Sequence, residues 1–157
     1  MRYARSLVAT ARGLTRRRGR ARRSDLNRAV STAYYALFAA IAFRLTFSLC
    51  GTRAAGREAS WDGVYRSIGH DALQSLLARH AAGHPASDRA RALSAAFARL
   101  KQQRNLADYD PAFRVTRAAA EQLVADCEEA LHLVEQISAQ DWLALAVALL
   151  VKTKDRP

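Results

Sequence analysis

Proline, glycine and cysteine are all scarce in this chain of 157 residues, which contains three prolines, seven glycines and two cysteines. So few helix breakers exclude collagen-like and low-complexity sequences, and they leave little room for long loops. The two thiols, Cys50 and Cys127, lie within apolar helical patterns. We therefore expect free, buried thiols in a reducing compartment rather than a disulfide framework.

Long hydrophobic runs are also missing. The longest, Ala33 to Phe43, ends at Arg44, and a second covers Trp142 to Val151. Both are shorter than the roughly 18 residues that a membrane span requires. Residues 2–23 are rich in arginine but have no apolar core of a secretory signal. We therefore expect a soluble, cytoplasmic protein with no membrane segment.

What the chain does have is helical periodicity, with no alternating strand pattern and no glycine-rich phosphate loop. Helices are expected over residues 24–50 (capped by Ser24 and ended by Gly51), from Ser60 to the Gly83–Pro85 breaker, from Ser87 to Tyr109, and around 123–137. Residues 3–14 are a further candidate, and the tail 142–151 either extends the last helix or forms a short fifth. The pattern predicts one domain over 1–157: an all-α, antiparallel bundle of four to five helices, with a basic segment 1–23 and an apolar extension 139–151.

Charge is distributed unevenly. The net charge is +11, yet nine arginines and no acid precede Ser24, whereas Glu121 to Asp141 holds six acids and no lysine or arginine. The arginine tract could bind phosphates, lie against the acidic segment of its own chain or of a second copy, or be a solvated surface. The candidate RNA-binding residues are Arg16, Arg17, Arg18, Arg20, Arg22 and Arg23.

Metal and cofactor motifs are not found in the sequence. The four histidines, His70, His80, His84 and His132, form no HExxH and have no cysteine at ligand spacing. There is also no nucleophile elbow. We expect no metal and no cofactor.

The end of the third expected helix carries an unusual arginine. The apolar stripe of Leu93, Phe97 and Leu100 continues directly to Arg104. A guanidinium is rarely buried without a partner. Arg104 therefore either pairs with Asp108 one turn later or points into a groove that takes a ligand. The candidate site residues are Arg104, Asn105, Asp108 and Tyr109.

Two stretches together resemble the HEPN superfamily, in particular its small stand-alone bacterial members. They are RAVSTAYYALFAAIA, from Arg28 to Ala42, and RNLADYD, which begins at Arg104. Gly69-His70 adds modest support, and the resemblance covers residues 26–137. It implies a helical bundle that dimerises and acts on RNA or a nucleotide, often in a toxin–antitoxin or defence module.

In active ribonucleases of this superfamily, an arginine that holds phosphate is followed after four to six residues by a histidine that assists attack by the 2′-hydroxyl. Arg104 matches the arginine, but Tyr109, Asp110 and Pro111 occupy the positions where the histidine is expected. Tyrosine and aspartate have unperturbed pKa values near 10 and 4, so neither replaces an imidazole at neutral pH. We therefore expect salt-sensitive RNA binding with slow or undetectable cleavage.

Three functions stay open. The first is an RNA- or nucleotide-binding homodimer with the Arg104–Tyr109 segments near the dimer axis. The second is an interaction protein that pairs with a nucleotidyltransferase-like antitoxin and in which Arg104 is structural. The third is an endoribonuclease with an unconventional base. Of the neighbouring residues, Tyr34 is expected in the core and Tyr35 against another helix, a second subunit or a ligand. His70 is expected on the helix surface or in packing, with a functional role as the alternative.

Overall fold

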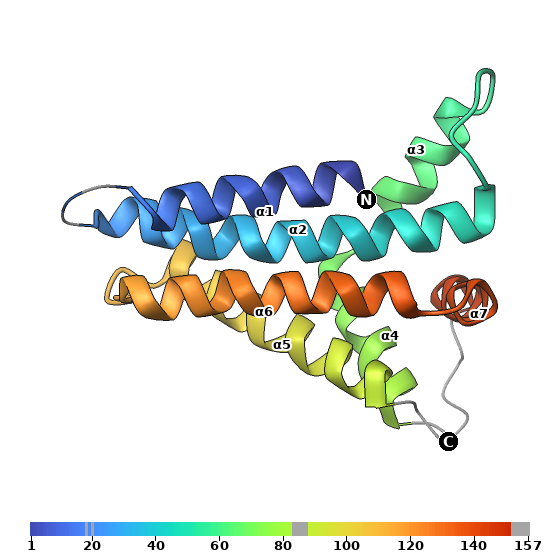
Figure 1. Cartoon of the computed structure of the whole chain (residues 1–157). Helices are drawn as coiled ribbons and strands as arrows, with labels where there is room; N and C mark the ends of the chain where they lie inside the picture. Colours follow the sequence, from blue (N-terminus) through green and yellow to red (C-terminus); the bar gives the residue numbers. More distant parts are fainter. Residues whose placement is uncertain (18, 20, 83–87, 152–157) are drawn as a thin grey trace.

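The computed structural model of the protein describes residues 1–17, 19, 21–82 and 88–151, and this part of the chain contains seven helices and no strand. The helices are α1 (Arg2–Thr15), α2 (Arg23–Cys50), α3 (Glu58–Ser67), α4 (His70–Ala82), α5 (Asp88–Tyr109), α6 (Arg117–Gln136) and α7 (Ala139–Leu150). The predicted all-α bundle is confirmed (Figure 1). Arg18, Arg20 and the expected breaker at 83–85 lie outside the described residues.

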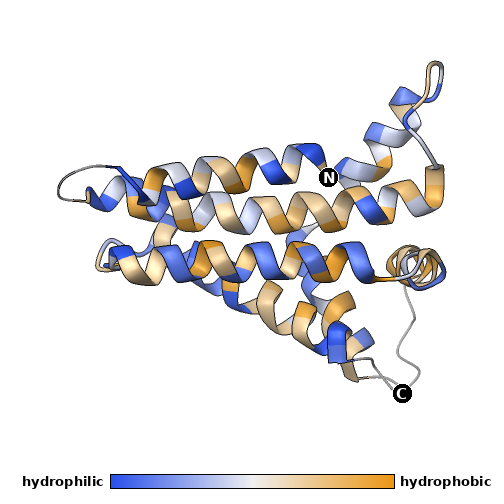
Figure 2. Ribbon diagram, in the orientation of Figure 1, coloured by the Kyte–Doolittle hydropathy of each residue, from blue (hydrophilic) through white to orange (hydrophobic). Residues whose placement is uncertain are grey.

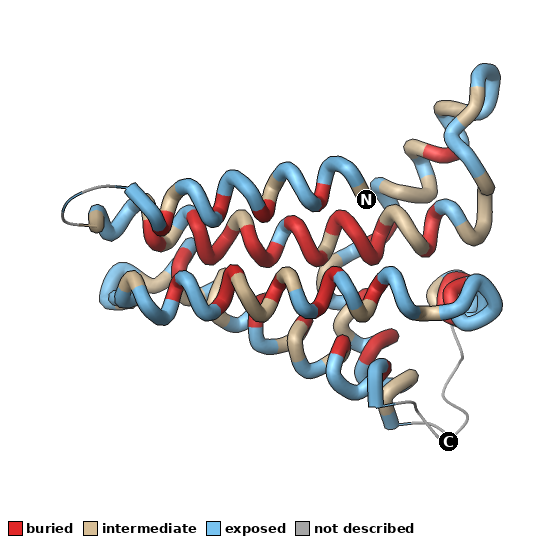
Figure 3. The backbone as a smooth tube through the Cα atoms, in the orientation of Figure 1, coloured by how far each residue is buried: buried red, intermediate tan, exposed pale blue. Residues whose placement is uncertain are grey.

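The central helix of the bundle is α2, which packs against α1, α5, α6 and α7 (Figures 1 and 3). Its run from Ala33 to Ala42 is buried almost all round, because helices of the same chain cover it. By length and composition alone α2 could cross a membrane, but 56% of its apolar window is buried inside the bundle. Its first helical residue is Arg23, and Ser24 makes no cap hydrogen bond. Gly51 ends it with a φ of 69°, a conformation that favours glycine.

The second expected helix is in fact two. The expectation of one helix from Ser60 is wrong, because α3 begins at Glu58 and the chain turns at Ile68 and Gly69 before α4 begins. Ile68 has an extended ψ of 103°, and its side chain is buried in the core. The turn therefore places His70 at the first position of α4, beside α2.

The C-terminal tail forms a separate helix. Ser138 caps α7, because its hydroxyl accepts a hydrogen bond from the amide of Asp141, and α6 and α7 meet at an angle of 102°. The buried face of α7 inserts Trp142 into the core. Figure 2 shows α7 end-on as a largely hydrophobic helix. Four apolar residues on α7 and at its end are exposed and form the α7 stripe: Leu143, Val147, Leu150 and Val151.

The basic start and the acidic segment of this chain contact each other. Arg5 pairs with Glu135 at 2.5 Å, and Arg12 pairs with Glu128. Part of the arginine tract is therefore neutralised by α6 of the same chain.

Both cysteines are free; Cys127 is buried, and burial raises its pKa to about 12. The thiol of Cys127 donates a hydrogen bond to the carbonyl of Ala33. Cys127 is therefore an unreactive residue of the core.

Candidate nucleic-acid interface

Arg104 is half-buried and held by three neighbours, with its side chain only 16% exposed. Its Nε lies 2.7 Å from Oδ2 of Asp108, an ion pair without hydrogen-bond alignment. Its Nη1 donates to Oδ1 of Asn105 at 3.1 Å, and its Nη2 donates to the hydroxyl of Tyr35 at 2.6 Å. The expected pair with Asp108 is therefore present. Each of the two Nη atoms carries a second N–H that these contacts do not use, so two donors are left besides the buried Nε.

Aromatic rings surround the same guanidinium. Its Cζ lies 5.4 Å from the ring centroid of Tyr35, 5.1 Å from that of Tyr109 and 6.0 Å from that of Tyr34. At these distances the negative ring faces stabilise the cation. Tyr34 is in the core, as expected, whereas Tyr35 and Tyr109 are exposed.

Asp108 is held by two contacts within the fold. It accepts a hydrogen bond from Ser31 of α2 and pairs with Arg104, so its charge is already compensated. One residue earlier, the carbonyl of Ala107 accepts from the side-chain amide of Asn27 at 3.0 Å. These contacts fix the last turns of α5 against α2. For Asp108, a candidate site residue, the structure therefore shows contacts within the fold.

His70 joins this cluster from α4. One ring nitrogen, Nδ1, lies 2.6 Å from the hydroxyl of Tyr34, and the ring packs against Phe38 at 4.1 Å and Tyr35 at 6.0 Å. Burial lowers the pKa of His70, and the nearby cations Arg104 and Lys101 lower it further. Both causes favour the neutral imidazole, and His70 and Arg104 both lie beside the Tyr35 ring.

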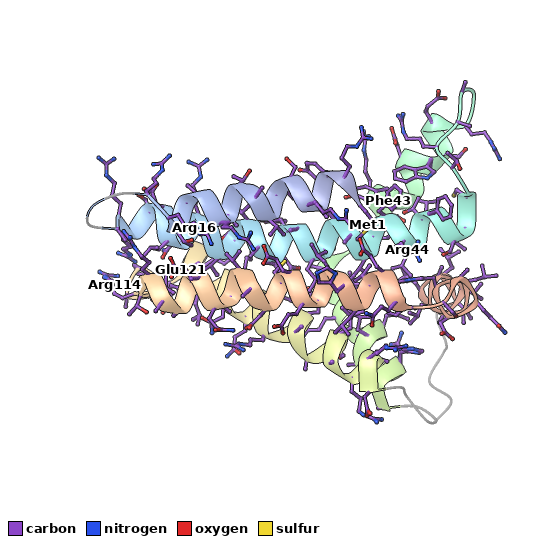
Figure 4. All side chains as sticks on the ribbon, in the orientation of Figure 1. Met1, Arg16, Phe43, Arg44, Arg114 and Glu121 are labelled. Atoms are coloured by element: carbon purple, nitrogen blue, oxygen red, sulfur yellow. The ribbon has the colours of Figure 1, made fainter. Side chains whose placement is uncertain are left out.

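A basic surface covers the end of the bundle where α5 finishes. The guanidinium of Arg23 donates to the carbonyls of Asp110 and Pro111, and that of Arg117 donates to the carbonyls of Arg17 and Gly19. These bonds join the α1–α2 and α5–α6 connections. The resulting basic end contains Arg16, Arg17, Arg22, Arg23, Arg114 and Arg117 among its described residues, near the acids Asp25, Asp110 and Glu121 (Figure 4).

Four of the six arginines predicted to bind RNA are described, and all four lie at this end. Arg17 pairs with Asp25 at 3.2 Å, and Arg23 binds the carbonyls named above. Arg16 and Arg22 are exposed.

Among residues 1–17, 19, 21–82 and 88–151, no group of three His, Cys, Asp or Glu side chains is placed to hold a metal ion.

The sequence places Arg104 with its partner on its own helix and does not predict its contact with Tyr35 of α2 or the position of His70 beside Tyr35. Ser31 and Tyr35 face α5 because they lie one turn apart on α2, and this spacing was visible in the sequence. The proximity of His70 depends on the turn at Ile68 and Gly69, for which the sequence offers only one glycine as a signal.

Comparison of the chain with protein-family models, with curated proteins and with solved structures gave no match.

Proposed function

We propose that this chain is a HEPN-type RNA-binding protein that acts as a cytoplasmic homodimer in a toxin–antitoxin or defence module. The observation that carries the proposal is that Arg104, a partly exposed guanidinium held by its neighbours, lies in the last two turns of the helix that ends at the basic end. Asp110, whose carbonyl accepts a hydrogen bond from Arg23, is six positions after Arg104, which corresponds to about 9 Å along a helix. One RNA strand can place successive phosphates at Arg104 and at the exposed arginines of the basic end.

The chemistry of Arg104 supports phosphate as its ligand. The surrounding side chains hold its guanidinium in one orientation, so little side-chain entropy is lost when a phosphate binds. Tyr35 accepts from Arg104 and keeps its own O–H as a donor toward the same ligand. The arginines of the basic end add attraction that does not depend on sequence.

Binding to single-stranded RNA should weaken steeply with salt, and Arg16→Ser/Arg22→Ser should flatten that dependence. Each phosphate neutralised on a single strand contributes a slope of about −0.7 in log affinity against log salt, so losing two contacts changes the slope by about 1.4. Fluorescence anisotropy with a labelled single-stranded oligonucleotide at several salt concentrations measures this slope. The matched control is Arg57→Ser/Arg66→Ser at α3, also exposed arginines. Equal changes in both variants would contradict a role for the basic end.

The interaction-protein alternative is favoured by the exposed apolar stripe of α7. A hollow of about 770 Å³ lies beside it, lined by Leu143, Val147 and Val151 together with Arg79 of α4. Because α2 is covered by its own chain, this stripe is an exposed apolar surface that a second protein could cover. It lies at the end of the bundle away from the basic end (Figure 1).

Light scattering at micromolar concentration should give twice the chain mass of 17.3 kDa. Val147→Lys, which places a charge in the α7 stripe, distinguishes between two possible dimer interfaces. A dimer formed through the Arg104–Tyr109 segments survives this substitution, whereas one formed through α7 dissociates. A parent protein that is monomeric under these conditions would rule out the homodimer.

One observation favours RNA cleavage as a second function. The imidazole of His70 and the guanidinium of Arg104 both lie beside Tyr35, although they come from different helices. In the tautomer whose Nδ1–H donates to Tyr34, Nε2 is free to take the proton of a 2′-hydroxyl. The oxygen attacks phosphorus, the 5′-oxygen leaves with a proton from water, and a 2′,3′-cyclic phosphate forms.

A further inference from the structure

The last two turns of α5 present a second feature near Arg104. Gln102, Asn105, Leu106 and Tyr109 line a hollow of about 450 Å³, together with Asp110. The spacing of these side chains, i, i+3, i+4 and i+7, places them on one face of the helix. The hollow is open to solvent, and Tyr109 forms its exposed wall with 71% of its surface accessible.

The Tyr109 ring is exposed and yet positioned. Its centroid lies 5.1 Å from the Cζ of Arg104, and the helix that carries it ends at Tyr109 itself. One part of the ring therefore contacts the guanidinium while the rest is open. A large aromatic ring with this exposure, next to a cation with two unused N–H donors, offers a flat surface for stacking beside a phosphate contact.

We infer that this hollow is a subsite for one unpaired base of single-stranded RNA, stacked on Tyr109, with the adjoining phosphate on Arg104. The inference rests on the proposed RNA-binding function and adds the substrate class: a single strand, or an unpaired loop, rather than a duplex. Bases within a duplex are already stacked and paired, so they do not reach an aromatic ring on a helix surface.

The other walls suit a base as well. Leu106 provides an apolar surface, and Gln102 and Asn105 provide side-chain amides that hydrogen-bond base edges. Because Oδ1 of Asn105 accepts from Arg104, the NH₂ group of Asn105 is directed to other acceptors. The negative charge of the Asp110 carboxylate disfavours a phosphate inside the hollow. Its Oδ1 accepts a hydrogen bond from the amide of Ala112. The phosphate is therefore placed at Arg104 and the base at Tyr109.

The test compares a labelled single-stranded RNA of twelve nucleotides with a blunt duplex of the same length and sequence, at one salt concentration. Tyr109→Ala should weaken binding of the single strand about ten-fold or more, which is the order expected for one base stacked on an aromatic ring. Tyr109→Phe, which keeps the ring, should bind within about two-fold of the parent. Neither substitution should change duplex binding. Tyr3→Ala, which removes an exposed tyrosine from α1, is the matched control and should have no effect.

Three results would overturn the inference. They are equal losses for single strand and duplex, a Tyr109→Phe protein as weak as Tyr109→Ala, or a Tyr109→Ala protein whose mass by light scattering differs from that of the parent. The last would assign Tyr109 to a protein–protein interface. A parent protein that binds neither RNA would reject the proposed function itself, and the inference with it. Circular dichroism checks that each variant is folded, which the exposure of Tyr109 leads us to expect.

Discussion

Replacing Arg104 with alanine is expected to lower the affinity for single-stranded RNA by about 10- to 100-fold. A hydrogen bond to a charged group contributes about 1.5–3 kcal/mol, which corresponds to this range. The substitution also removes the cation that compensates Asp108, so a carboxylate is left beside the site and repels phosphate. Anisotropy titrations of the parent and the variant, at equal salt, measure the difference.

Two further variants separate binding from folding. Arg104→Ala/Asp108→Ala removes the uncompensated carboxylate, so its folded state should be closer to that of the parent while its RNA affinity stays low. Arg104→Lys keeps the charge but loses the planar fork that meets Asn105 and Tyr35 together, and its affinity should fall between those of the parent and Arg104→Ala. If the folded double variant binds RNA as well as the parent does, Arg104 is structural and the interaction-protein function is favoured.

The pKa of His70 provides an independent readout of the same change. Burial lowers this pKa first, and Arg104 lowers it next, so Arg104→Ala should move it up toward the ordinary histidine value of about 6.5. In the parent, folding favours the neutral imidazole. The stability that this group contributes is therefore present above the unfolded-state pKa and is lost as pH falls from there toward the folded-state pKa. NMR titration, with the signal assigned by its absence in His70→Gln, follows the imidazole directly.

The same variants address cleavage. If His70 is the base, His70→Gln should keep RNA affinity and lose the formation of a 2′,3′-cyclic phosphate, in the presence of a chelator as in its absence. If the parent forms no such product, the missing histidine near Arg104 in sequence is not replaced by His70, and the protein binds RNA without cutting it.

The sequence was sufficient for the helical fold because its apolar residues recur at helical spacing, and because Gly51 and Pro111 mark helix ends that the structure contains. It also located the Arg104–Asp108 pair, since the two residues are one turn apart on one helix. The contacts that complete the site are different in kind. Tyr35 is 69 residues from Arg104 along the chain and meets it only because α2 and α5 pack together.

The contacts of the arginine tract also depend on how helices that are distant along the chain pack together. Local charge gave three alternatives, and the structure distributes the tract among them. Arg5 and Arg12 pair with α6, whereas Arg16 and Arg22 stay exposed at the basic end. Which arginines are neutralised depends on where α1 ends relative to α6, and that is a property of packing rather than of composition.

The largest effect on stability is expected from Trp142→Ala, which should lower the free energy of unfolding by about 3–5 kcal/mol. Trp142 is fully buried at the bend between α6 and α7. Its indole N–H donates to the carbonyl of Val134 at 3.3 Å, and the Cζ of Arg44 lies 5.8 Å from its ring. The substitution leaves a cavity, an unpaired carbonyl and a half-buried arginine without its aromatic neighbour.

Urea denaturation followed by circular dichroism measures this loss, with Leu143→Ala as the control. Leu143 is the next residue of the same helix but is 46% exposed, so its truncation should change the free energy of unfolding by less than about 0.5 kcal/mol. Because α7 lies at the end of the bundle away from the basic end, folded Trp142→Ala protein should bind RNA as the parent does. Equal destabilisation by the two substitutions would mean that α7 is not anchored by Trp142. A loss of RNA affinity in the folded variant would mean that the two ends of the bundle are coupled.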